Sequence, residues 1–452
     1  VAAAGAVDQT ITLGSANDNV TVAGLTAKDT ITGGEGTDRV TLADAGTNEA
    51  TKMVGVEQIG VTTNNTNINL VNAADVNLIA VAEVAGGINV NNVTAAKSGL
   101  TFAFEGEGTV AVPADGKDAN FGGIKYNLAN AVGTSDVINF TFGNKGVAMA
   151  KDAVVNIGTL NNSGNNVETL NFTFSDLIAS NTVTIADIEA GAETALNTLN
   201  FTSDSKVVVN GVADLKAVTK VDATGVKAGF VATFGSGVAG ELGANADTNI
   251  LLGGAGKNTV SVTGAESTAG TAATTNKVLT LDGSAGTGQQ TLSLVNNDAN
   301  TTLAAVNGYS AVVRGGMGGD TITVTSIAGA GVLVAAGGGI DTINLGGSVA
   351  MDLVQLSLGD TGSTVASADT VNGFNAALDK LDLRNFGFDV GLQGVDNNGT
   401  VALDGTAGEF GGLAVSKAVV GGNTQVYVDT NGDDRLSDGD LVVVLNGVAA
   451  AN

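Results

Sequence analysis

Apolar residues alternate with Thr, Asn and Ser along much of the chain, most regularly between residues 50 and 310. A period of two places alternate side chains on opposite faces of a β-strand, so that one face is buried while the other stays polar. Clusters of Asn, Gly and Ser between these runs are typical of turns. The pattern predicts an all-β fold of sandwich or solenoid strands, with short helical turns only near residues 175–196. The clearest runs are VEQIGVTT, DVINFTF, ETLNFTFSD and LNTLNFTSDSKVVVNG.

Changes in this pattern divide the chain into four predicted segments. Residues 1–50 hold short strand repeats, and residues 51–250 form a longer β-rich region. Residues 251–310 contain a degenerate glycine-rich turn, and residues 311–452 contain complete glycine-rich turns and a C-terminal hairpin. A chain of 452 residues is long enough for several domains. No apolar run approaches the length of a membrane helix, so no membrane insertion is expected.

Composition narrows the chemistry that the chain can perform. It has 45 acidic and 19 basic residues, giving a formal net charge of −26, and it contains neither His nor Cys. This charge repels nucleic acid and anionic membranes and favours hard cations. The missing residue types exclude disulfides, thiolate or imidazole zinc sites and His-dependent catalytic triads. Sixty-six Gly with a single Pro, and no three-residue Gly period, indicate many short strands with tight turns.

Three short segments near the N-terminus each place an Asp two residues before an aliphatic residue. They are NDNVTV, KDTITG and TDRVTL, and their spacing near nine residues predicts short stacked strands. The third is part of GGEGTDRVT, which matches the calcium-binding nonapeptide G-G-x-G-x-D-x-U-x. Its glycines permit left-handed turns that expose carbonyls, and its carboxylate neutralises a cation; the alternative is an ordinary Gly-rich turn. The predicted metal residues are Asp18, Asp29, Gly33, Gly34, Gly36 and Asp38.

A second group of glycine-rich turns lies between residues 253 and 361. GGAGKNTVSV has Asn258 in place of the Asp and is expected to bind no metal. GGMGGDTIT is complete, and another copy follows after about two nonapeptides, the spacing that lets successive coils share an ion. Calcium is therefore predicted between Asp320 and Asp341. The predicted residues are Gly315, Gly316, Gly318, Asp320, Gly337, Gly338, Gly339, Asp341 and, in a turn with a single Gly, Asp360.

The C-terminal stretch TQVYVDTNGDDRLSDGDLVVVLNGV predicts a hairpin with a cation-sized pocket in its turn. Oxygen-bearing residues fall at positions 1, 3, 5, 7, 9 and 12 of an EF-hand-type calcium loop, with position 7 contributing a backbone carbonyl. The loop departs from that pattern at position 6, where Asp434 replaces Gly, and at position 12, where Asp replaces Glu. The alternative is a solvated acidic turn. The predicted ligands are Asp429, Asn431, Asp433, Arg435, Ser437 and Asp440.

The segment ADTVNGFNAALDKLDLRNFGFD, together with this hairpin, resembles the C-terminal portion of RTX proteins. In that family a DxIxxF…DxxDL element closes a β-roll, and Asp369, Phe374, Asp379 and Asp382 occupy the matching positions. The resemblance implies calcium binding and type I secretion directed by the C-terminal end, which would explain a chain that starts at Val1 without a signal peptide. Serralysin proteases share this C-terminus, but their HExxH zinc motif is impossible without His.

Residues 120–450 are also similar to the RTX-type S-layer proteins of Gram-negative bacteria, through TSDVINFTF, VETLNFTFSD and the run from Thr202 to Val226. The resemblance implies a multi-domain β-solenoid or β-sandwich lattice protein with calcium-binding RTX β-roll elements. It further implies calcium-dependent self-assembly into a two-dimensional array on the cell surface, with lipopolysaccharide as a second partner. No helical anchor domain of that family is recognisable in this sequence.

Two other function classes remain open at this point. An RTX adhesin or biofilm-matrix protein would share the C-terminus but would present a ligand-binding tip instead of a periodic lattice. An enzyme, such as a polysaccharide lyase or glycosidase, would use paired carboxylates. Fourteen Phe, three Tyr and no Trp argue against a sugar-binding cleft built on stacking, and we expect a structural protein and not an enzyme.

Overall fold

The computed structural model describes the chain in nineteen stretches. They are residues 8–43, 50–63, 66–82, 87–93, 100–105, 119–129, 134–143, 154–161, 167–189, 195–213, 215, 217–235, 247–263, 278–296, 309–326, 331–346, 351–386, 396–397 and 401–449. The structure is 54% strand and 2% helix, which confirms the predicted all-β class. Within these stretches, no helix has the length and apolar character needed to cross a membrane. The chain forms two compact units, Val1–Thr233 and Phe234–Asn452, and the predicted four-segment division stays a prediction.

The first unit consists of parallel strands that the chain forms as it winds in successive coils. Most strands pair with the strand two places further along, as β2 does with β4 and β4 with β6. The strands are β1 (Thr10–Thr12), β2 (Asn19–Val22), β3 (Thr30–Thr32), β4 (Arg39–Leu42), β5 (Lys52–Val54), β6 (Gln58–Val61), β7 (Thr66–Asn69), β8 (Leu78–Ala82), β9 (Ile88–Val93), β10 (Thr101–Glu105), β11 (Ala119–Phe121), β12 (Ile124–Leu128), β13 (Val137–Gly143), β14 (Val154–Asn161), β15 (Thr169–Phe174), β16 (Thr182–Glu189), β17 (Thr198–Ser203), β18 (Lys206–Val209), β19 (Val212–Ala213), β20 (Lys220–Val226) and β21 (Phe230–Phe234).

In-register stacking explains why the alternating sequence forms this unit. Phe140 of β13 lies over Phe172 of β15, with ring centroids 5.4 Å apart, and Phe172 lies 4.8 Å from Phe201 of β17. All three side chains are buried, so each coil extends one continuous apolar core. On the opposite face of the same strands, Asn171 donates to Asn139 at 2.7 Å and Asn200 donates to Asn171 at 2.8 Å. Like residues therefore stack on like residues on both faces.

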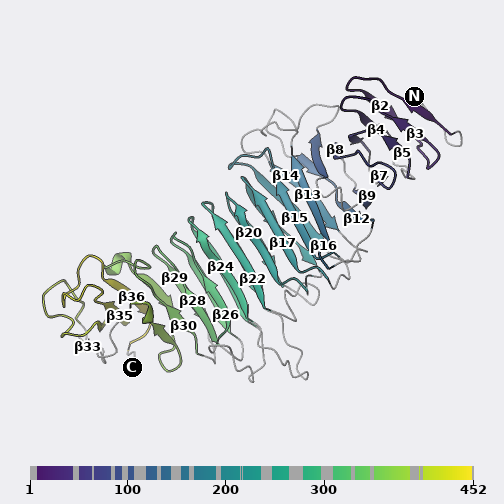
Figure 1. Cartoon of the computed structure of the whole chain (residues 1–452). Helices are drawn as coiled ribbons and strands as arrows, with labels where there is room; N and C mark the ends of the chain where they lie inside the picture. The colour runs from purple at the N-terminus through teal and green to yellow at the C-terminus, as the bar shows by residue number, and fades with distance from the viewer. Residues whose placement is uncertain are drawn as a thin grey trace, which may run out of the picture. The chain divides into compact units, whose positions relative to one another are not determined.

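The second unit has the same parallel, solenoid-like winding. One of its sheets runs β22-β24-β26-β28-β30-β32, and another contains β23-β25-β27-β29-β31 (Figure 1). Its elements are β22 (Thr248–Gly254), β23 (Asn258–Thr263), β24 (Leu279–Gly286), β25 (Gln290–Asn296), β26 (Tyr309–Arg314), β27 (Thr321–Ser326), β28 (Gly331–Ala335), β29 (Thr342–Gly346), β30 (Leu353–Gln355), η3 (Val365–Ser367), β31 (Asp369–Asn372), β32 (Lys380–Asp382), η4 (Arg384–Phe386), β33 (Asp396–Asn397), β34 (Val415–Val420), β35 (Asn423–Val428) and β36 (Leu441–Asn446).

An antiparallel cap closes the second unit at its C-terminal end. β34 pairs with β35 and β35 with β36, both antiparallel, which confirms the predicted C-terminal hairpin. β36 then pairs in parallel with β31, so the cap continues the solenoid sheet. The cap has its own small core, formed by Ala368, Leu403, Phe410, Ala418, Tyr427, Val442 and Val444.

Two expectations about local structure are settled by these elements. The predicted helical turns near residues 175–196 are wrong for the described residues, because β16 occupies the centre of the window and the other described residues there form no helix. Its Val183, Ile185 and Ile188 are buried and pair with neighbouring coils, which favours the strand. Of the two predicted architectures, the parallel pairing between coils supports the solenoid.

Candidate metal centres

A row of aspartates crosses successive coils of the second unit, which we call the first ladder: Asp320, Asp341 and Asp369. Asp320 and Asp341 directly precede β27 and β29, and Asp369 is the first residue of β31. The backbone N–H of Asp320 donates to Asp341 Oδ1 at 2.7 Å, and that of Asp341 donates to Asp369 Oδ1 at 2.8 Å. Gln290 N–H donates in the same way to Asp320 Oδ1 at 2.7 Å. Each carboxylate thus accepts a hydrogen bond from the backbone of the preceding coil and so stabilises the stacking of the two coils.

The second carboxylate oxygens of this ladder differ from one another. Asp320 Oδ2 accepts from the Gly316 N–H at 2.7 Å. Asp341 Oδ2 and Asp369 Oδ2 accept no hydrogen bond, although the two residues are only 1% and 0% exposed. Burial of a carboxylate oxygen without a donor is costly unless a cation or a proton neutralises it. These two oxygens are therefore the ones in the first ladder that lack a partner to neutralise their charge.

The pKa values of the carboxyl groups in the first ladder are raised. Burial raises the pKa of Asp320 to about 6, that of Asp341 to about 7 and that of Asp369 to about 8. The negative charge of Asp360 contributes to the raised pKa of both Asp341 and Asp369, so Asp360 lies close enough to interact with them. None of these four carboxylates forms an ion pair with Lys or Arg in the part of the chain that the structure describes.

Glycine allows the turns that carry these aspartates to nest against one another. A Cβ at Gly315 would overlap the carbonyl oxygen of Ala336 and lie 2.5 Å from Asp320 Oδ2. Gly337 has φ +89°, and a Cβ there would overlap the carbonyl oxygen of Gly316. The structure thus brings the predicted residues of two successive turns into contact, including Gly316, Gly318, Gly338 and Gly339.

A shorter ladder of the same kind occurs in the first unit. The Asp18 N–H donates to Asp38 Oδ1 at 2.9 Å, and the Asp38 N–H donates to Glu57 Oε2 at 2.8 Å. Asp38 is fully buried and its Oδ2 has no partner. A Cβ at Gly33 would lie 2.5 Å from that oxygen and would overlap the Gly55 carbonyl oxygen. Glu57 takes the place of a third Asp here, and its turn has no glycine motif that the sequence analysis could have found.

Asp29 does not belong to this ladder. It precedes β3, which pairs with β1 and β5, whereas Asp18 and Asp38 precede β2 and β4 of another sheet. Asp29 Oδ1 accepts from the Gln9 N–H and Oδ2 from the Thr26 N–H, both at 2.6 Å. The repeat near nine residues is thus half a coil, and residues 20 apart are the ones that stack. Gly34 and Gly36, with φ +122° and +113°, lie against the turn that contains Asp18.

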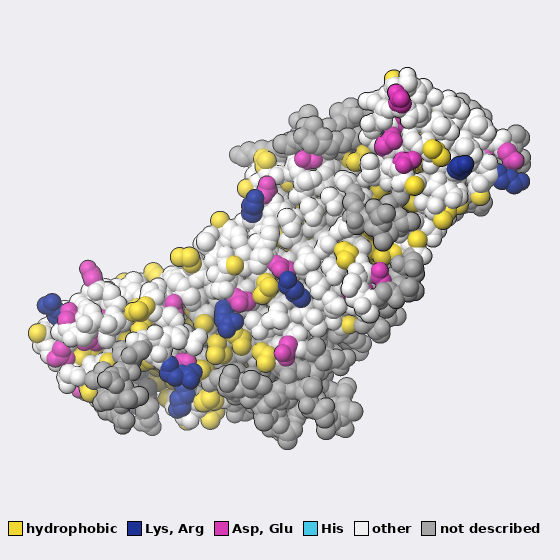
Figure 2. Space-filling view, viewed as in Figure 1, with side chains coloured by type: hydrophobic (Ala, Val, Ile, Leu, Met, Phe, Trp, Pro, Cys, Tyr) yellow, Lys and Arg dark blue, Asp and Glu magenta, His cyan; other side chains and the backbone are white. Residues whose placement is uncertain are grey.

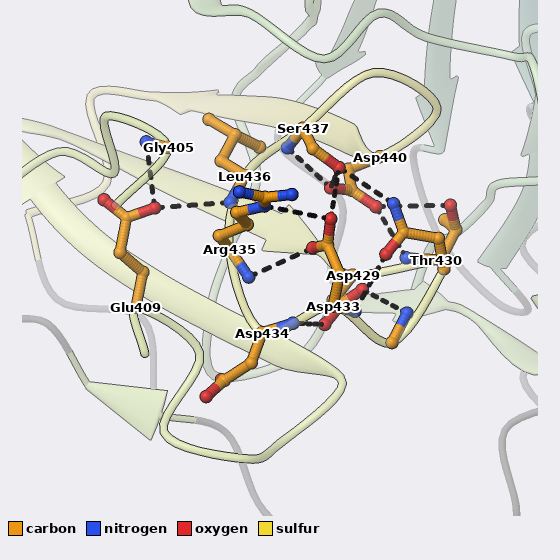
Figure 3. A network of polar contacts seen from close by, with 12 residues as sticks. Gly405, Glu409, Asp429, Thr430, Asp433, Asp434, Arg435, Leu436, Ser437 and Asp440 are labelled. Atoms are coloured by element: carbon orange, nitrogen blue, oxygen red, sulfur yellow. Dashed lines mark hydrogen bonds and ion pairs between the residues drawn. The ribbon is translucent and has the colours of Figure 1, made fainter. Parts of the chain in front are cut away.

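The C-terminal loop between β35 and β36 brings three carboxylates together. One oxygen each of Asp429, Asp433 and Asp440 lies within 4.8 Å of the others, the one such group of three that the described residues contain. Asp429 Oδ1 accepts from the Gly432 N–H at 2.6 Å, and Asp440 Oδ1 accepts from the Thr430 N–H at 2.9 Å (Figure 3). Backbone donors therefore fix the carboxylates of positions 1 and 12 before any ion binds.

The remaining predicted loop residues complete the same network. Asn431 Nδ2 donates to Ser437 Oγ at 2.8 Å, and Ser437 Oγ donates to Asp433 Oδ2 at 3.1 Å. The Arg435 side chain pairs with Asp433, with Nε 3.1 Å from Oδ2 (Figure 3). The loop pattern predicted only a backbone carbonyl ligand from Arg435, and nothing in the spacing indicated this internal cation. An ion bound here would compete with Arg435 for the Asp433 carboxylate.

The unusual residue at position 6 has a structural explanation. Asp434 adopts φ +58°, the left-handed conformation for which this position ordinarily carries Gly. Its Oδ1 accepts from the Gly412 N–H at 2.9 Å, and its carbonyl accepts from the N–H groups of Gly408 at 2.8 Å and Glu409 at 3.1 Å. The Asp434 side chain thus adds a hydrogen bond to the segment 403–413 that Gly could not make.

Glu409 strengthens this attachment from the other side. Its Oε2 accepts from the N–H groups of Gly405 at 3.0 Å and Leu436 at 3.2 Å (Figure 3). The adjacent Phe410 is fully buried in the core of the cap. The geometry of the loop and the packing of the cap are therefore linked through a few hydrogen bonds.

The ladders and the loop share one chemistry, that of oxygen ligands without His or Cys. Figure 2 shows Asp and Glu side chains only at scattered points of the visible face, most of which is uncharged. Much of the acidic chemistry instead lies in buried turns, with Asp38, Asp320, Asp341, Asp369 and Asp440 each at most 1% exposed. No protein-family model matches the chain, and a search of curated proteins found no significant match.

Proposed function

We propose that this protein is a structural subunit of an extracellular bacterial surface layer whose coils and C-terminal loop are held together by Ca²⁺. The observation that carries the proposal is the pair of buried, unpartnered oxygens on Asp341 and Asp369. Carboxylate and carbonyl oxygens suit a hard cation, and Ca²⁺ accepts the six to eight oxygen ligands and irregular geometry that stacked turns provide.

The proposed role of the ion is to neutralise charge that the folded coils bring together. The chain has a net charge of −26, and the first ladder places carboxylates of successive coils beside one another. Where calcium is scarce, repulsion between them disfavours the folded coils; where it is abundant, binding to the folded state alone stabilises that state. This behaviour suits a protein that is exported and then folds outside the cell.

Assembly and location are proposed from the resemblance of residues 120–450 to RTX-type S-layer proteins. On this proposal the chain is secreted by the type I route, assembles with copies of itself into a two-dimensional lattice, and associates with lipopolysaccharide at the cell surface. The role is structural and not catalytic. A calcium-dependent RTX adhesin or matrix protein is the second candidate, since it would use the same ladders without a periodic lattice.

Negative-stain electron microscopy of the purified protein with chelator and with Ca²⁺ tests the proposal. Ordered sheets that disappear with chelator and return with Ca²⁺ are the expected result. Particles that stay monodisperse in both conditions would overturn the lattice, and calcium-dependent folding without sheets would favour the adhesin. A circular-dichroism titration with Ca²⁺, run in parallel, separates folding from assembly.

A further inference from the structure

A second row of carboxylates lies at the other turn of the coil, where the chain enters the sheet of β28, β30 and β32. We call it the second ladder: Asp352 and Asp379, which directly precede β30 and β32. The Val332 N–H donates to Asp352 Oδ1 at 2.9 Å, and the Asp352 N–H donates to Asp379 Oδ1 at 2.9 Å. This is the bonding of the first ladder, repeated on a different sheet.

One oxygen of the second ladder has no donor. Asp379 Oδ2 accepts from the Asn375 N–H at 2.8 Å, whereas Asp352 Oδ2 accepts no hydrogen bond. Asp352 is 1% exposed and Asp379 is 4% exposed, so bulk water does not solvate the Asp352 carboxylate. Asp352 therefore resembles Asp341 and Asp369. In each buried carboxylate, one oxygen accepts a backbone N–H of another coil and the other oxygen has no partner.

The charges around Asp352 do not neutralise it. Burial raises its pKa to about 6, the Val332 N–H opposes this rise, and the negative charge of Asp379 adds to it. The nearby Asp382 differs, because Arg384 pairs with it through Nε at 2.7 Å and lowers its pKa to about 2. Among the described residues, neither carboxylate of the second ladder forms an ion pair of this kind.

The backbone of this turn lies directly against the preceding coil. A Cβ at Gly331 would overlap the carbonyl oxygen of Met351 and lie 3.2 Å from the Asp352 nitrogen, so only Gly lets the two turns come this close. The residues before Asp352 read LGGSVAM and do not match the nonapeptide, so no motif marks this turn in the sequence. The relation to Asp379 arises only when the coils stack.

We propose that Asp352 and Asp379 form a further binding site for a hard divalent cation at this turn, centred on the buried, unpartnered Oδ2 of Asp352. The site rests on the proposed function, because it extends calcium binding from one turn of the coil to both. Its consequence is that both sheets of the second unit, and not only the sheet entered through the glycine-rich turns, are held by ions.

The test is to count bound Ca²⁺ in the full chain carrying Asp352→Asn, by equilibrium dialysis followed by atomic absorption. The amide keeps an oxygen for the Val332 N–H but removes the charge, so the variant is expected to fold and to bind one Ca²⁺ fewer per chain. Asp204→Asn is the matched control, since Asp204 is exposed and forms an ion pair with Lys227 at 2.6 Å, and it should bind as many ions as the unmodified protein.

The outcomes separate this inference from the proposed function. If Asp352→Asn binds as many ions as the control, Asp352 is only a brace and the inference is overturned. If the unmodified protein binds no Ca²⁺, the proposed function itself fails. If Asp352→Asn does not fold, as judged by circular dichroism, the Ca²⁺ count is repeated on Asp379→Asn. This variant keeps an acceptor for the Asp352 N–H and is expected to lose the same ion; an unchanged count would overturn the inference.

Discussion

Asp369 accepts the backbone N–H of Asp341 on one carboxylate oxygen, at 2.8 Å, while its other oxygen is buried without any donor. The first bond stabilises the stacking of two coils whether or not the group is charged. The second oxygen makes the charged form unfavourable unless a cation lies beside it. On the proposed function, the same residue both stabilises the fold and makes its stability depend on Ca²⁺ and on pH.

We expect the chelated protein to become less stable as the pH rises from about 4 to about 8. The folded-state pKa values of Asp320, Asp341 and Asp369 are about 6, 7 and 8, above the ordinary 3.8, because burial disfavours the charged form. Their contribution to stability is fully present below the unfolded pKa and is lost as the pH rises through these folded values. Thermal melts in chelator should give a lower Tm at the higher pH.

Calcium provides the control for this pH dependence. A bound divalent cation favours the ionised carboxylates, so the fall in Tm between the two pH values should shrink in excess Ca²⁺. Equal falls with and without Ca²⁺ would mean that the ladder carboxylates bind no cation.

The double variant Asp320→Asn with Asp341→Asn should respond more weakly to Ca²⁺. Both amides keep an acceptor for the N–H of the preceding coil, so the coils can still stack, but two ligand charges are lost. We expect the midpoint of a calcium titration followed by circular dichroism to rise at least about tenfold, or ~1.4 kcal/mol. An unchanged midpoint would rule out a cation at these two turns.

Gly337→Ala should destabilise the second unit by about 1–3 kcal/mol, measured by chemical denaturation. The residue has φ +89°, and its new Cβ would overlap the Gly316 carbonyl oxygen. Gly338→Ala is the matched control, because the nearest atom to its Cβ would be 3.6 Å away and its φ lies outside the left-handed region. Similar losses in the two variants would contradict the nesting of the turns.

Asp434→Gly should weaken the attachment of the segment 403–413 without preventing the loop from folding. Gly tolerates the φ of +58° but cannot accept from the Gly412 N–H. We expect faster hydrogen exchange at the amides of Gly412 and Glu409 and a loss of stability of about 1 kcal/mol. Asp434→Asn, which retains an acceptor, should behave like the unmodified protein, and exchange rates that are the same in all three proteins would refute the attachment.

The sequence predicted strands well where alternation was strict, as in β13, β15 and β17. It could not predict which strands pair, because coil length varies: Val40 pairs with Ile59, whereas Phe102 pairs with Phe142. Short helical turns were predicted near residues 175–196, yet Val183 and Ile185 are buried at alternate positions of a strand, β16.

The candidate sites were predicted only where a local motif marks them. Asp38, Asp320 and Asp341 follow glycine-rich turns, so their spacing was enough to find them. Glu57 and Asp352 carry the same relation to a neighbouring coil without any glycine motif, and their equivalence arises from stacking alone. Asp434 was a departure from the loop pattern in sequence, and only its bond to Gly412 explains it.

The first ladder also has a direction. Each bond between its coils runs from a backbone N–H to a carboxylate that comes later in the chain. The N–H of the last member, Asp369, donates to Thr361 Oγ1. The Thr361 hydroxyl in turn donates to the Val442 carbonyl at 2.9 Å. A coil is thus completed only by residues synthesised after it. During synthesis the last coil of this ladder therefore stays incomplete until β36 provides the Val442 carbonyl.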